Sequence, residues 1–178
     1  MTVDPEFSRP IPIDTIGAGA VEHEISANPD ECAALAKRFG LKAIATLGAR
    51  ADVRREGDQI FADGSVQAEV TQSCVVTDEP IAHSVNEGFS LRFVPEDAPK
   101  DEEEIELSAD ECETLTYLGG AIDLGEAAAE TLALTLDPFP RGPNADDALR
   151  DAGVISEEEA GPFGALKGLR DQLAAKKD

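Results

Sequence analysis

The stretch from Val70 to Pro95, VTQSCVVTDEPIAHSVNEGFSLRFVP, decides how this chain folds. It is typical of two strands joined through a turn at Thr77-Asp78-Glu79-Pro80. In the second strand, large apolar residues alternate with polar ones, and this period of two places successive side chains on opposite faces of a sheet. The large apolar residues of that strand are Val85, Phe89, Leu91 and Phe93.

The chain before this stretch predicts more strands and one helix. We expect an edge strand at best within residues 6–13 and strands at 20–25, 41–55 and 60–72, with Gly64 as the candidate for a β-bulge. A helix should start at Pro29, with Asn28 as its N-cap, and end before Gly40. The predicted fold class is α+β: an antiparallel meander sheet or partial β-barrel, with this N-terminal helix packed on it and further helices at the C-terminus.

The chain after this stretch changes character. Residues 96–113 hold ten acids and one lysine and predict a flexible, solvated loop, with a docking arm for a basic partner as the alternative. Order should resume at 115–122, followed by helices at 124–136, 146–150 and 162–176 and a frayed tail at 174–178. Asp123 and Glu126 have the spacing of a capping box for the first of these helices. We expect a single domain over residues 1–178.

Composition limits the partners. The chain has 37 acidic and 15 basic side chains and a net charge of −22. Residues 1–60 hold ten acids and seven bases, hence −3, and residues 61–178 hold the other 27 and 8, hence −19. Acidic surfaces repel phosphate, so a basic protein is the natural partner, although such a charge also serves solubility alone. Three widely spaced cysteines indicate a reducing cytoplasm, and we find neither a membrane span nor a secretory signal.

The search for chemistry predicts a protein that is not an enzyme and holds no cofactor. The chain lacks a G-x-S-x-G motif and a phosphate-binding glycine loop, and neither His23 nor His83 has an evident nucleophile nearby in sequence. Cys74 is not part of a C-x-x-C pair, and Cys74 with His83 would leave zinc two ligands short. We therefore expect Cys74 to be a buried strand cysteine and predict no metal site.

One concentration of basic residues is the candidate contact surface for RNA or a partner. If the strand from Leu41 runs back along the helix before it, several of these side chains could share a face and bind phosphate; the alternative is that they are solvated rim charges. Arg141, between two prolines, is a further candidate. The concentration consists of Lys37, Arg38, Lys42, Arg50, Arg54 and Arg55.

The order and spacing of several short motifs resemble the YceD family, the large ribosomal RNA subunit accumulation proteins. The helix at residues 31–39 resembles the alphaproteobacterial type, and residues 162–169 resemble the short C-terminal helix of the family. The residues that carry the resemblance are Cys74, Glu79, Pro80, Phe89, Phe93, Asp123, Leu124, Glu126, Glu130, Pro138 and Pro140.

The resemblance implies a cytoplasmic protein of ribosome biogenesis that is needed for accumulation of the large-subunit (23S) rRNA and has no enzymatic activity. Some relatives carry a second cysteine where this chain has Thr77, which argues against zinc here. The resemblance and the negative net charge together predict an acidic adaptor for a basic ribosomal or assembly protein. The alternative is a direct rRNA-binding protein that uses the small basic patch.

Overall fold

The computed structural model describes residues 5–96, 113–117 and 119–154. The chain divides into two compact units, one of residues up to 72 and from 80 to 138, the other of residues 73–79 and from 139 onward. The predicted single domain stays a prediction. Three predicted segments lie outside the described residues: the helix at 162–176, the tail at 174–178 and most of the acidic loop.

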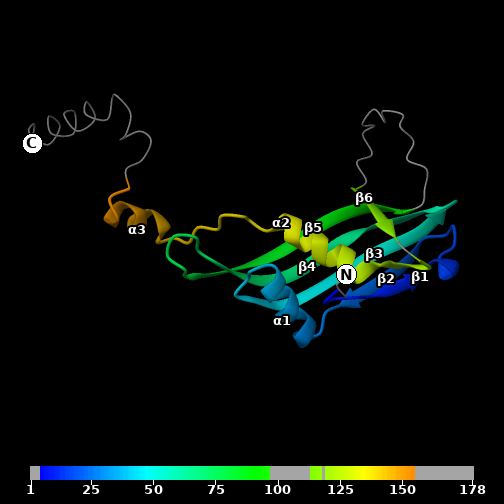
Figure 1. The fold of residues 1–178 in the computed structure, drawn as a ribbon, viewed down its shortest axis with the longest axis horizontal. Helices are drawn as coiled ribbons and strands as arrows, with labels where there is room; N and C mark the ends of the chain where they lie inside the picture. Colours follow the sequence, from blue (N-terminus) through cyan, green and yellow to red (C-terminus); the bar gives the residue numbers. More distant parts are fainter. Residues whose placement is uncertain (1–4, 97–112, 118, 155–178) are drawn as a thin grey trace, which may run out of the picture. The chain divides into compact units, whose positions relative to one another are not determined.

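The first unit is built on a five-stranded sheet (Figure 1), whose strands stand in the order β2-β3-β4-β5-β6. The strands are β2 (Val21–Ser26), β3 (Ala43–Glu56), β4 (Gln59–Ser73), β5 (Pro80–Pro95) and β6 (Glu113–Tyr117). The predicted α+β class and the mostly antiparallel sheet are confirmed, because β3 pairs antiparallel with both β2 and β4. The described sheet is open, with β2 and β6 at its edges.

Strand β6 is the part of the sheet that the sequence did not predict. Glu113, expected at the end of the acidic loop, begins this strand, which runs parallel to β5 with Glu113 opposite Leu91. A parallel pair needs a crossover connection of about a dozen residues or more, and the chain between Pro95 and Glu113 is long enough to provide it. The meander prediction was wrong here because it assumed that neighbouring strands follow short turns.

Two short strands form a separate small sheet. β1 (Pro10–Pro12) pairs antiparallel with β7 (Ala121–Asp123), which confirms a short edge strand within residues 6–13. A single 3-10 turn, η1 (Ile13–Thr15), follows β1.

The helix α1 (Pro29–Arg38) begins as predicted. The Asn28 side chain accepts hydrogen bonds from the backbone N–H groups of Asp30 and Glu31, at 2.9 and 3.0 Å. The Glu31 carboxylate in turn accepts from the Asn28 backbone N–H at 2.7 Å, which completes a capping box. After the helix, Gly40 takes the left-handed conformation (φ 67°) that lets the chain turn toward β3.

Helix α2 (Leu124–Thr135) and α1 cover the same face of the sheet as β1 and β7 (Figure 1). Alternate residues of β3 and β4 are buried against them, and the remaining residues face solvent on the open side. The predicted bulge at Gly64 was wrong: the register shift lies between Ile44 and Thr46. Gly64 instead permits a close approach, since a Cβ there would stand 2.2 Å from the Arg50 carbonyl oxygen.

The described part of the second unit is a turn and a short helix. Residues 73–79 connect β4 to β5, and α3 (Ala145–Asp151) follows the chain that leaves α2. The predicted short helix at 146–150 is confirmed. None of the helices that the structure describes is long and apolar enough to cross a membrane.

Candidate functional site: an acidic groove beside helix α2

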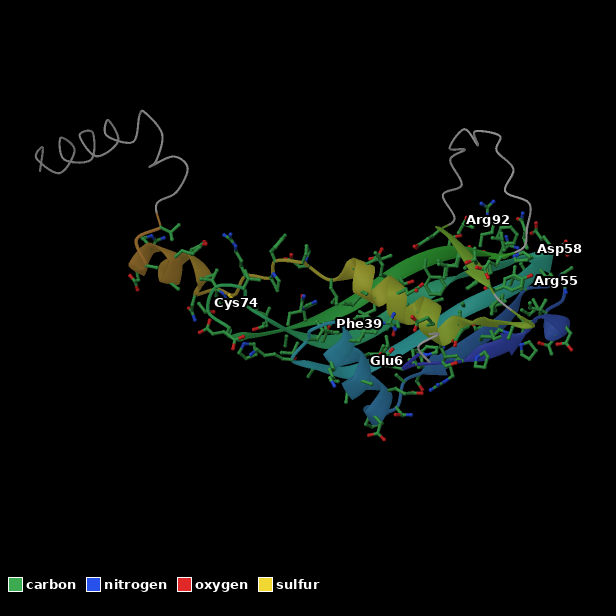
Figure 2. All side chains as sticks on the ribbon, viewed as in Figure 1. Glu6, Phe39, Arg55, Asp58, Cys74 and Arg92 are labelled. Atoms are coloured by element: carbon green, nitrogen blue, oxygen red, sulfur yellow. The ribbon has the colours of Figure 1, made fainter. Side chains whose placement is uncertain are left out.

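The basic residues predicted to share a face are divided between the two faces of the sheet. Lys37 and Arg38 lie in the last turn of α1, on the covered face. Arg50 and Arg54 alternate along β3 with buried residues, so their side chains point to the open face. Arg55 lies at the turn between β3 and β4, away from α1 (Figure 2). The strand therefore brings its arginines near one another but not near those of the helix.

Most arginines in the described ranges are held by carboxylates of the chain itself. Arg38 donates to Glu6 at 2.9 Å and to Glu126 at 2.7 Å, and Arg9 binds Glu31 through both terminal nitrogens. The other pairs are Arg50 with Glu22 and Glu24, Arg54 with Glu56 and Asp63, Arg55 with Asp58, Arg141 with Asp146, and Arg150 with Asp147. A phosphate would have to displace these carboxylates to reach the guanidinium groups.

Two of these interactions shift the pKa of a partner group. The hydrogen bonds that Arg38 donates to Glu126 and Glu6 raise the pKa of its guanidinium group, so it stays charged. The hydrogen bond from Arg9 lowers the pKa of Glu31. Lys42, in the loop before β3, also belongs to the predicted set, and its backbone N–H donates to the Thr71 carbonyl at 2.8 Å.

The first turn of α2 is fastened to the N-terminal part of the chain. The Asp123 carboxylate accepts from the backbone N–H groups of Gly125 (2.9 Å), Glu126 (3.2 Å) and Arg9 (2.8 Å), and from the Ser8 hydroxyl. The predicted cap by Asp123 is confirmed. Glu126 does not complete a capping box, because its side chain binds Arg38 rather than the backbone of residue 123. Leu124, between them, is fully buried.

A groove runs along α2 on the side of β5 and β6. It consists of two hollows of about 370 and 440 Å³, both lined by these three elements. Each hollow has an apolar part and a carboxylate rim, and neither is lined by a lysine, arginine or histidine. We call it the α2 groove. Its apolar lining includes Phe89, Leu91, Phe93, Leu115, Tyr117 and Leu134, and its carboxylates are Glu87, Glu113, Asp123, Glu126 and Glu130.

Among the groove carboxylates, Glu130 has a raised pKa. Partial burial raises its pKa, and the charges of Glu126 and Glu113 add to the effect against the opposing influence of Arg38. A negative charge in the middle of the groove is therefore poorly stabilised by the protein. Leu134, one turn further along α2, is 73 % exposed. The groove therefore combines an exposed apolar side chain with several carboxylates.

The second unit holds the Cys74 turn. The backbone N–H of Gly142 donates to the Cys74 sulfur at 3.3 Å, and the thiol is buried. This hydrogen bond, with help from Thr77, lowers the pKa of Cys74 to about 7. Asn144 donates to both oxygens of Glu79, at 3.0 and 3.2 Å. In the described residues, no three His, Cys, Asp or Glu side chains are grouped so that they could hold a metal ion.

The remaining motif residues occupy structural positions. Phe93 is buried in the core, and Phe89 packs against it at the margin. Pro140 accepts a hydrogen bond from the Val75 backbone N–H through its carbonyl oxygen, at 2.9 Å. Pro80 begins β5, and Pro138 follows α2 within the first unit.

The family comparison agrees with this placement of the motif. Residues 62–170 match the family model described as large ribosomal RNA subunit accumulation protein YceD. The chain belongs to the YceD family. The family name implies a role in large-subunit rRNA accumulation and ribosome biogenesis. No curated protein and no solved structure matches the chain.

Sequence reasoning missed most of the α2 groove. Of its carboxylates, only Asp123, Glu126 and Glu130 were singled out, for a capping box or a family motif rather than for a binding surface. Glu113 was missed because it was assigned to the acidic loop. Leu134 was assigned to the apolar face of the helix, yet it is mostly exposed in the structure.

Proposed function

We propose that this protein supports accumulation of the large-subunit rRNA without catalysis, as a cytoplasmic, acidic adaptor that holds a basic ribosomal or assembly protein. The observation that carries this is the contrast between its charges. Its arginines are largely taken up by its own carboxylates, whereas the α2 groove also presents Glu87, Glu113 and Glu130, which take part in none of the ion pairs described above. rRNA accumulation would then follow indirectly, because the partner is kept soluble and available for assembly.

The net charge supports a protein partner over RNA. Nucleic-acid affinity comes largely from lysines and arginines that neutralise phosphates, and this chain carries −22 overall. A basic ribosomal protein instead requires negative charge around it, since its own positive charge must be screened before it meets rRNA. Complementary charge also speeds the encounter of two proteins and selects the partner.

Binding of the purified chain to large-subunit rRNA and, separately, to purified large-subunit ribosomal proteins tests the proposal at a low and a high salt concentration. We expect salt-sensitive capture of one or a few basic proteins and no RNA signal. Specific RNA binding that Arg54→Glu with Arg55→Glu abolishes would contradict the adaptor and support direct rRNA binding. The matched control is Arg92→Glu with Arg150→Glu, which changes the net charge equally.

A further inference from the structure

The α2 groove is long enough to hold a helix. Its two hollows follow one another along α2 beside β5 and β6 (Figure 1), and the α2 residues that line them run from Glu126 to Thr135. At a rise of about 1.5 Å per residue, this stretch of α2 is about 14 Å long, which is the length of two to three helical turns. The volumes of the hollows, about 370 and 440 Å³, lie within the usual range of binding pockets, about 300–1,000 Å³.

The groove has an apolar floor between two acidic walls. Phe89 and Phe93 of β5 belong to the floor, Glu87 and Glu113 come from the strands on one side, and Glu130 comes from α2 on the other. The charge of Glu113 contributes to the raised pKa of Glu130, so the two walls are close enough to repel each other. The walls therefore favour a ligand with cations on both sides of an apolar stripe.

The form of such a ligand follows from where its side chains point. The apolar and acidic side chains of the groove lie on the face of the sheet that α2 covers. An extended segment turns only every second side chain toward such a face. A helix with apolar residues three and four positions apart turns a continuous stripe toward the floor, and the residues that flank the stripe reach both walls.

We infer that the α2 groove binds an amphipathic basic helix of the partner protein, with its apolar stripe on the groove floor and its lysines or arginines against the carboxylates of both walls. This inference rests on the proposed adaptor function and gives it a site and a form of ligand. The mode of binding is that of a helix in a groove, in which apolar anchors at helical spacing hold the ligand. The charge pairs then select a basic helix over an acidic one.

Charge decides between this occupant and others. Residues 97–112 carry eight acids and one lysine, so the groove would repel them. RNA would be repelled as well, because it is a polyanion. Residues 162–177 carry four bases against one acid, so this part of the chain itself is the competitor that the experiment must separate from a partner.

The test titrates full-length protein with two fluorescently labelled peptides of identical composition, made of leucine and lysine. In the first peptide the leucines recur three and four residues apart, as in an amphipathic helix, and in the second they alternate with lysines, as in a strand. We expect the helical peptide to bind about fivefold more tightly or better, because only its leucines can all face the groove. Equal affinity of the two peptides, or tighter binding of the alternating one, would overturn the inference.

A pair of matched double variants locates the helical peptide. Glu113→Gln with Glu130→Gln should weaken binding about fivefold, since each partly exposed charge pair is worth roughly twofold in affinity. The control, Asp14→Asn with Asp52→Asn, removes two exposed carboxylates outside the groove and should change the dissociation constant less than about twofold. Equal weakening by the two double variants would mean that binding follows net charge alone and would contradict the inference.

The groove also contains its own reporter. Tyr117 lines one hollow and is the single tyrosine of a chain without tryptophan, so the fluorescence of the protein reports on the groove. Saturating helical peptide should change this emission, and binding that leaves it unchanged would count against the site. Leu134→Gln should weaken binding about fivefold, whereas Val21→Thr, at another exposed apolar position, should not. Unaltered affinity in Leu134→Gln would likewise overturn the inference.

A further variant separates the chain's own segment from a partner. Leu166→Gln with Leu169→Gln removes apolar side chains from residues 162–177 without changing the charge. The helical peptide should bind this variant as it binds the wild type. Tighter binding would assign the groove to the chain itself rather than to a partner.

The two proposals fail in different ways. If wild-type protein and Glu113→Gln with Glu130→Gln capture the same purified ribosomal proteins equally well, the adaptor stands and the groove is not its site. If wild-type protein captures none of them, the adaptor fails, and the peptide titration alone then decides whether the groove binds basic helices.

Discussion

The two ends of helix α2 use the same kind of side chain in opposite ways. In the first turn, Asp123 accepts four hydrogen bonds, and Glu126 is held by Arg38. In the second half, Glu130 lies among other carboxylates, and Leu134 is mostly exposed. The first end contributes to the fold, whereas the second end forgoes stability that a neutral or basic residue would supply. Carboxylates that stabilise the fold can thus be distinguished by their contacts from carboxylates that do not.

The largest expected effect is the loss of the contacts made by Asp123. Asp123→Ala removes the helix cap, worth about 1–2 kcal/mol, and leaves the donors of Ser8 and Arg9 without their acceptor, at about 1 kcal/mol more. We expect the free energy of unfolding to fall by about 3 kcal/mol in a urea titration. Asp123→Asn should recover part of the loss, and an unchanged midpoint for Asp123→Ala would show that the first turn is not fastened as described.

The next effect comes from the close approach of the N-terminal segment to α2. A Cβ at Gly125 would stand 2.6 Å from the Phe7 carbonyl oxygen and 2.9 Å from the Arg9 backbone nitrogen. These are backbone atoms, so the clash can be relieved only by moving the segment. Gly125→Ala should therefore destabilise the protein by about 2 kcal/mol despite the better helix propensity of alanine. Gly120→Ala, with open space around its Cβ, is the control.

A smaller loss should follow removal of the guanidinium that joins α1 to α2. Arg38→Met keeps much of the side-chain volume but leaves Glu6 and Glu126 without their shared cation, and the three side chains are partly exposed. We expect a loss of about 1 kcal/mol at pH 7.

The loss should depend on pH with a defined sign. The pKa of Glu6 is lowered in the fold, chiefly by a backbone hydrogen bond and further by Arg38. Its contribution is present above the unfolded pKa and disappears as pH falls through the folded pKa. The difference between wild type and Arg38→Met should therefore shrink in acid, and a difference that grows would contradict the ion pair.

Local signals in the sequence were sufficient for most of the fold. Asn28, Pro29 and Gly40 mark the ends of α1 because capping and left-handed turns depend on the residues at those positions. Alternation in β5 predicted which of its large apolar residues face the core. These features act over a few residues, so one sequence is enough to find them.

The α2 groove could not be predicted because it depends on residues far apart in the chain. Parallel pairing brings Glu113 beside Leu91, and packing of α2 then brings Glu130 near both. Likewise, the division of the predicted basic residues between the two faces follows from the packing of α1, which the sequence of β3 does not reveal. Both the groove and the division of the basic residues depend on contacts between distant parts of the chain, and a local sequence pattern does not predict such contacts.

The smallest effect on stability distinguishes the two ends of α2 most clearly. Glu130→Gln removes a charge whose pKa is raised by burial and by neighbouring acids, so the variant should be more stable by a few tenths of a kcal/mol at pH 7, a gain kept small by solvent screening. The gain should vanish as pH falls through the raised pKa, because Glu130 in the wild type then becomes neutral as well. Thermal melts across that range measure it. A stability gain would show that the charge of Glu130 costs the fold stability, whereas a stability loss would mean that it serves the fold as Asp123 does.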